Sequence, residues 1–171
     1  MNFKLKQLGH GIALASLLAA AGTAYGATQG DLGATSTGSL DLEVVIPALV
    51  RVSNLSDVDF GSYDGEGDLS ETQQICVYSN ATDGYNLRAE SVNVGGFALD
   101  SGSNTLSYSV TIGGVALTEN SLVAMTGANT TSVNCGGGGD TAMVLTIAEP
   151  DLQAAPSGTY TDTLTLYVEA L

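Results

Sequence analysis

Apolar and polar residues alternate along much of this chain, and this two-residue period is the feature that most constrains its fold. The pattern is clearest over residues 161–170, whose polar face carries three threonines and a glutamate. The apolar face of this segment consists of Leu164, Leu166, Val168 and Ala170. Residues with this period lie on opposite sides of a half-buried β-strand. The pattern therefore predicts a C-terminal strand with one face in a core and a partner strand to lie against.

Similar segments, separated by turn-forming residues, predict further strands. They are expected over residues 39–46, 73–79, 85–92, 104–117, 121–126 and 141–150, the last of which stops at Pro150. One face of the longest segment carries Leu106, Tyr108, Val110 and Ile112. Within it, Gly113 and Gly114 predict a two-residue hairpin turn. Because no segment shows a convincing 3.6-residue period, the chain is predicted to be one all-β domain, an antiparallel sandwich or barrel, preceded by an extension.

The first 26 residues have the features of a secretory signal peptide. Lys4 and Lys6 precede an apolar run from Ile12 to Ala21, and small residues follow at Ala24 and Gly26. The run is too short to serve as a stable membrane anchor. We therefore expect an exported mature chain of 145 residues that begins near Ala27 and is not inserted in a membrane.

The composition after residue 26 excludes several classes of function. This part keeps two arginines and all 18 acidic residues, a net charge of −16, and it contains neither histidine nor lysine. Such a charge repels nucleic acid and anionic membranes. The missing histidine and lysine remove the commonest general base, metal ligand and Schiff-base amine. We therefore expect no enzyme activity, no cofactor and no nucleic-acid partner.

Two cysteines, Cys76 and Cys135, lie 59 residues apart in a chain that is expected to be exported. An oxidising compartment favours a disulfide between them, and two free thiols are the alternative. By loop entropy the cross-link would stabilise the fold by roughly 4 kcal/mol.

Two short motifs offer alternative functions. Asp100-Ser101-Gly102 matches the signature of an aspartic-protease carboxylate, with Asp140 as a weaker second copy, but Asp100 to Asn104 are all favoured turn residues. Six acidic residues crowd residues 57–71 and could attract Ca²⁺, although their spacing does not fit a calcium loop. A hairpin turn and a solvated loop are the favoured interpretations, and no metal site is predicted. A self-contained sandwich that binds a ligand or Ca²⁺ through its acidic loops remains the alternative.

Three segments together resemble a known family. "TGSLDLEVVI", "LSDVDFGSY" and "PSGTYTDTLTLYVEAL" are similar to subunits of chaperone–usher pili, most of all to the archaic branch that shares the spore coat protein U type of domain. The resemblance implies an incomplete immunoglobulin-like β-sandwich that lacks its last strand and is completed by donor-strand addition. It also implies a structural role in a surface pilus or fimbria for adhesion or biofilm, and partners in a periplasmic chaperone, an outer-membrane usher and related pilin subunits. The cysteine positions depart from the archaic pattern, so the family does not supply the disulfide.

The resemblance also implies roles for residues at both ends of the chain. Residues 27–46 would form the donor-strand extension and residues 47–171 the pilin domain. The side chains expected to enter the groove of a neighbour are Leu32, Ala34, Gly38, Leu40, Leu42, Val44 and Ile46. The groove of the acceptor is expected beside Leu164, Leu166, Val168 and Ala170. The alternative is that residues 39–46 form the first strand of a complete sandwich.

Overall fold

The computed structural model describes residues 26–81 and 84–171. The chain forms two compact units, Met1–Val45 and Ile46–Leu171. The predicted signal peptide lies, apart from Gly26, outside the described residues. Within the part of the chain that the structure describes, no helix is long and apolar enough to cross a membrane.

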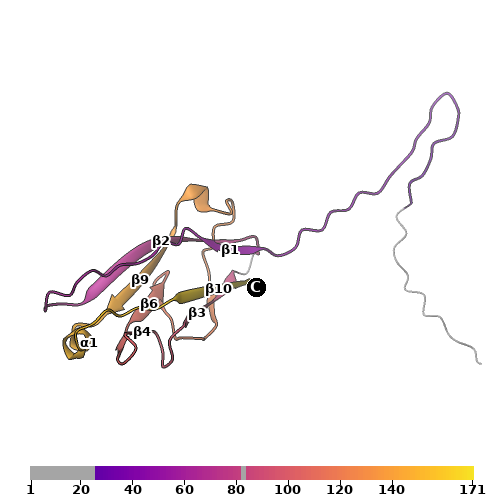
Figure 1. Ribbon diagram of the computed structural model, residues 1–171. Helices are drawn as coiled ribbons and strands as arrows, with labels where there is room; N and C mark the ends of the chain where they lie inside the picture. Colours follow the sequence, from indigo (N-terminus) through magenta and orange to yellow (C-terminus); the bar gives the residue numbers. More distant parts are fainter. Residues whose placement is uncertain (1–25, 82–83) are drawn as a thin grey trace, which may run out of the picture. The chain divides into compact units, whose positions relative to one another are not determined.

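The second unit is an all-β antiparallel sandwich, as predicted (Figure 1). The larger sheet has the strand order β1-β2-β9-β6-β7, formed by Val50–Ser53, Leu69–Ser79, Thr141–Ile147, Ser109–Ile112 and Val115–Ala116. The smaller sheet has the order β10-β3-β8, formed by Leu164–Ala170, Tyr85–Ser91 and Val123–Met125. A short pair, β4 (Ala98–Asp100) and β5 (Thr105–Ser107), forms a separate ribbon.

The core lies between the larger and the smaller sheet. It consists of the alternate residues that the two-residue period places inward. Its buried members include Ile75, Val77, Tyr85, Leu87, Ala89, Val110, Ile112, Met143 and Leu145. Their neighbours along the strands face outward, so β9 alternates strictly between buried and half-buried residues. Each large apolar side chain that is fully buried contributes about 1.5–3 kcal/mol of transfer free energy. The period thus defines the inner faces of both sheets.

The longest predicted strand is divided in the structure. Leu106 lies in β5, which pairs with β4, whereas Val110 and Ile112 lie in β6, which pairs with β9. The chain changes sheets at Tyr108, whose backbone N–H donates to Phe97 O at 2.9 Å. The prediction of one continuous strand was wrong here, because alternation is the same in two strands that join different sheets. The predicted Gly113–Gly114 turn is confirmed, with Ile112 opposite Val115 across the β6–β7 hairpin.

A short helix, α1 (Glu149–Ala154), follows β9 at the point where the sequence predicted only the end of a strand. Its first turn contains Pro150, which is compatible with a helix start because proline has no backbone N–H and an N–H at this position would have no partner within the helix. Asp68 Oδ1 accepts the N–H of Glu149 at 2.8 Å, which satisfies one of the free donors of this turn. Six residues are too few to show a helical period, and for that reason sequence alone missed α1.

Candidate functional site

The C-terminal strand β10 lies at the edge of its sheet with one side of its backbone unpaired. It pairs with β3 from Leu164 opposite Ser91 to Ala170 opposite Tyr85. Val92 N–H donates to Thr163 O at 3.1 Å, so the backbone groups of Thr163 and of every second residue after it face β3. The backbone groups that face away from β3 therefore belong to Leu164, Leu166, Val168 and Ala170. No described strand forms a ladder on that side.

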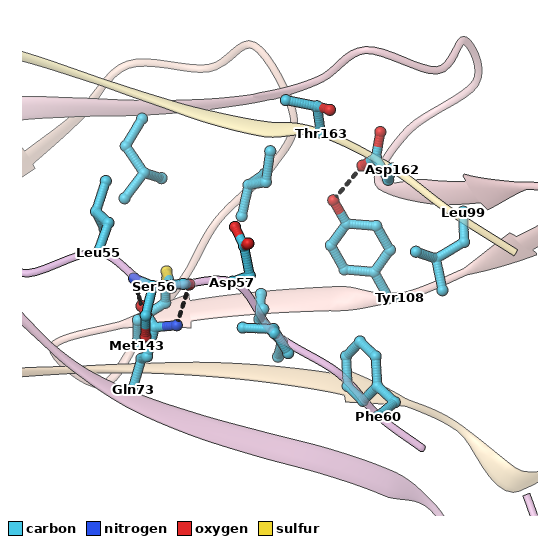
Figure 2. Close-up of a pocket in the computed structure, with 14 residues that line it drawn as sticks. Leu55, Ser56, Asp57, Phe60, Gln73, Leu99, Tyr108, Met143, Asp162 and Thr163 are labelled. Carbon is cyan, nitrogen blue, oxygen red and sulfur yellow. Dashed lines mark hydrogen bonds between the residues drawn. The ribbon is translucent and has the colours of Figure 1, made fainter. Parts of the chain in front are cut away.

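A groove of about 470 Å³ opens beside the first half of β10 (Figure 2). One wall is the 55–60 segment, the other is the 162–166 segment, and Met143 and Leu145 of the larger sheet contribute to the lining. The apolar side chains that line it are Leu55, Val58, Phe60, Leu99, Met143, Leu145, Leu164 and Leu166. The groove thus brings partly exposed apolar side chains, among them Leu164 and Leu166, next to unpaired backbone groups.

Only part of the predicted acceptor set lines this groove. Leu164 and Leu166 do so, whereas Val168 and Ala170 do not belong to its lining. Val168 is half-buried against the core, in the half of β10 that follows the groove. Strand β1 lies close to β10 and narrows the space beside β10.

The wall formed by residues 55–60 belongs to a segment that leaves the larger sheet after β1. Asn54 has a positive φ of 62°, which turns the chain at the end of that strand. Beyond it, side chains rather than a backbone ladder hold the segment to β2. Asn54 Nδ2 donates to Gln74 O at 2.6 Å, and Ser56 N–H donates to the Gln73 side chain at 3.2 Å. Residues 54–60 form no strand, and no pattern in the sequence predicted that they would wall a groove.

Tyr108 and Asp162 form a hydrogen-bonded pair at one end of the groove, as Figure 2 shows. The hydroxyl of Tyr108 donates to Asp162 Oδ2 at 2.5 Å, and Asn93 Nδ2 donates to Asp162 Oδ1 at 3.0 Å. Burial raises the pKa of Tyr108 above its ordinary range, and the hydrogen bond to Asp162 raises it further. Both oxygens of this half-buried carboxylate therefore have protein donors. Tyr108 and Asp162 are 54 residues apart, so sequence analysis had no signal for the pair.

Tyr108→Phe is expected to lower the free energy of unfolding by about 1.5 kcal/mol at pH 7, because Asp162 loses a donor. The raised pKa of Tyr108 also makes stability depend on pH. The contribution of protonated Tyr108 to the free energy of unfolding is complete below the ordinary tyrosine pKa of 10.0. It is lost as the pH rises from there toward the higher pKa of Tyr108 in the folded chain. Urea unfolding at pH 7 and at about pH 10.5 measures both effects.

The matched control for this prediction is Tyr160→Phe, which removes a hydroxyl that donates to Pro156 O at 2.8 Å away from the groove. It removes a neutral hydrogen bond and is expected to cost less. If the Tyr108→Phe variant lost as much stability at alkaline pH as the wild-type chain does, the assignment of this pH dependence to Tyr108 would be contradicted.

The predicted donor residues lie in an exposed segment. Leu40, Leu42 and Val44 are 66%, 88% and 81% exposed, and residues 40–49 form no strand. The first strand of the sandwich is β1, not residues 39–46. Leu32 and Ala34 lie in a bend over residues 32–35. The roles assigned to these side chains stay predictions.

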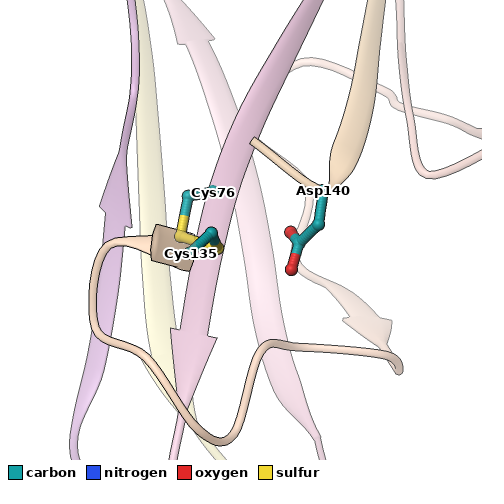
Figure 3. Close-up of side chains that lie close together, drawn as sticks. All are labelled: Cys76, Cys135 and Asp140. Carbon is teal, nitrogen blue, oxygen red and sulfur yellow. A yellow bond between two sulfur atoms is a disulfide. The ribbon is translucent and has the colours of Figure 1, made fainter. Parts of the chain in front are cut away.

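The predicted disulfide between Cys76 and Cys135 is confirmed (Figure 3). It joins the fully buried Cys76 of β2 to the loop that precedes β9. The Asp140 carboxylate lies near the two sulfurs, so the three side chains have the spacing of a metal site. Because both sulfurs are bonded to each other, they are not available as thiolate ligands.

The two alternative motifs have structural roles. Asp100 and Thr105 face each other across the β4–β5 hairpin, and Asp100 Oδ1 accepts the N–H of Gly102 at 2.6 Å. The Asp100-Ser101-Gly102 motif is therefore a turn, as favoured from sequence. In the acidic loop, Asp59 accepts the N–H of Gly61 at 2.8 Å, and Asp68 binds the start of α1. These two carboxylates thus hold backbone turns.

Comparison with known proteins supports the fold. No protein family model matches the chain, and no curated protein matches it. Among solved structures, it is similar to a chain of a chaperone–tip adhesin complex of CFA/I fimbriae biogenesis, with a TM-score of 0.54 and 15% identity over 71% of this chain. The match spans only 41% of that protein's chain. At this level of identity, the likeness shows a shared β-sandwich fold.

Proposed function

We propose that this chain is a non-enzymatic structural subunit of a surface pilus or fimbria, assembled by donor-strand exchange. The observation that carries the proposal is the apolar groove beside the unpaired edge of β10. The immunoglobulin-like sandwich is then incomplete, and the strand that completes it comes from the N-terminal extension of a second copy or of a related subunit.

The chemistry of the extension suits this groove. A donor strand needs backbone groups for a ladder with β10 and alternate apolar side chains for the apolar groove. Residues 40–46 offer both, because Leu40, Leu42, Val44 and Ile46 occupy every second position of an exposed segment and would share one face in an extended strand. Burial of each such side chain contributes about 1.5–3 kcal/mol, so a few of them support stable association.

The proposed route of assembly includes the partners that the sequence resemblance implies. A periplasmic chaperone covers the groove first, an outer-membrane usher exports the subunit, and a neighbouring subunit then replaces the chaperone strand. The resemblance to chaperone–usher subunits and the likeness to a chain from a chaperone–adhesin complex support this route. Membership of the archaic, spore coat protein U-type branch and a role in adhesion or biofilm belong to the same proposal.

Deletion of residues 27–46 tests the proposed function. The mature chain is expected to form polymers whose size increases with concentration, whereas the shortened chain stays monomeric and is less stable because its groove remains open. A synthetic peptide of residues 38–46 is expected to raise the melting temperature of the shortened chain in a concentration-dependent manner. Light scattering after size exclusion and thermal unfolding measure these effects. A mature chain that is a stable monomer, and that keeps its full stability after the deletion, would refute the proposal.

A further inference from the structure

The N-terminal extension contains a hairpin of its own over residues 28–39. Thr28 N–H donates to Ser39 O at 2.8 Å, and Ser39 N–H donates to Thr28 O at 3.0 Å. This reciprocal pair is the hydrogen-bonded pair of an antiparallel ladder. The bend at residues 32–35 connects the two arms. The predicted donor segment is therefore not one continuous extended strand.

Two glycines allow the arms of this hairpin to approach closely. A side chain at Gly30 would collide with Ser36 Oγ on the opposite arm. A Cβ atom at Gly38 would lie only 3.0 Å from Thr28 O. Neither glycine has a positive φ, so close approach rather than backbone conformation is the reason for glycine here. The local sequence therefore favours the hairpin, because both positions of close approach are glycine.

A donor strand with simple alternation has a register problem. A slip by one residue turns every apolar side chain away from the groove, and alternation excludes it. A slip by two residues keeps the same face inward, and residues 32–46 have small or apolar side chains at nearly every position of that face. Alternation by itself therefore does not define which residue enters the groove first.

We propose that the 28–39 hairpin is a register stop that limits the donor strand to residues 40–46, an inference that rests on the proposed function. A groove that admits one strand does not admit two paired arms, since neighbouring strands lie about 4.8 Å apart. Leu40 is then the first apolar side chain that enters, and Leu32, Ala34 and Gly38 stay outside. The hairpin thus blocks the two-residue slip that would draw Gly38 and the residues before it into the groove.

A disulfide lock across the hairpin tests this inference in the full mature chain. The hydrogen-bonded pair Thr28 and Ser39 has a Cα separation that suits a disulfide, so the Thr28→Cys, Ser39→Cys variant closes the hairpin. We expect the locked chain to polymerise within twofold of the wild-type rate. A locked chain that polymerises at least tenfold more slowly, and recovers in reductant, would overturn the inference. The wild-type chain in the same reductant is the control, because reductant also acts on the native disulfide.

Deletion of residues 27–37 tests the stop itself. This chain keeps the complete donor strand but no hairpin, so its polymers are expected to contain more than one register and to melt in two or more transitions. Wild-type polymers are expected to melt in one. A shortened chain whose polymers melt in a single transition at the wild-type temperature would overturn the inference. If the wild-type chain itself does not polymerise, the proposed function fails instead.

Discussion

Leu42→Asp is expected to abolish polymerisation of the mature chain. In the proposed complex, Leu42 is the middle apolar side chain between Leu40 and Val44 and lies in the groove of the neighbour. The substitution removes about 2 kcal/mol of apolar burial and places a charge against an apolar surface, which adds a further cost. The sum corresponds to a loss of affinity of more than about 100-fold. Light scattering after size exclusion, over a range of protein concentrations, measures the change.

The same chemical change at Leu32 provides the control for this prediction. Leu32 is also fully exposed and belongs to the same extension, but it lies in the bend of the 28–39 hairpin. Leu32→Asp is expected to leave polymerisation unchanged. Equal losses in the two variants would show that the whole extension enters the groove. No loss in either variant would show that this segment is not the donor.

Removal of the disulfide has the largest expected effect on stability. Cys76→Ala with Cys135→Ala is expected to lower the free energy of unfolding by about 4 kcal/mol, because the cross-link closes a loop of 59 residues in the unfolded chain. In the folded chain it ties the loop before β9 to the centre of β2. Urea unfolding of the monomeric chain that lacks residues 27–46, with and without the two cysteines, measures the loss.

The single variant Cys135→Ala separates the cross-link from the packing of Cys76, which is fully buried. It leaves the Cys76 side chain in the core and should cost nearly as much as the double variant. A loss below about 1 kcal/mol in the double variant would show that the unfolded chain is already compact around this loop.

The two-residue period was sufficient to predict the fold class and the inner faces of most strands. It placed Leu106, Val110 and Ile112 on one face, and all three are buried in the structure. Alternation succeeds here because the inward direction of a side chain in a strand depends only on its parity along the chain. The turn at Gly113–Gly114 was predictable for a similar reason, since the conformation of a two-residue turn depends on its own residues.

The candidate groove required the tertiary structure. At its polar end, Tyr108 is hydrogen-bonded to Asp162. The wall formed by residues 55–60 is irregular backbone after Asn54, and side-chain hydrogen bonds hold this segment to Gln73 and Gln74. These contacts connect residues that are 17 to 54 positions apart, and no local pattern records them. The same limit explains the divided strand at Tyr108, because alternation does not identify the sheet that a strand joins.

By itself, the sequence determined an all-β chain, its disulfide pair, and two alternating segments at opposite ends. These properties follow from local periodicity, turn chemistry and the number of cysteines. Only the tertiary structure decided that β10 has an unpaired edge, that the groove lies beside Leu164 and Leu166, and that residues 28–39 close on themselves. An unpaired edge is a property of how strands are ordered in a sheet, and that order depends on contacts between distant residues rather than on the pattern within any one strand.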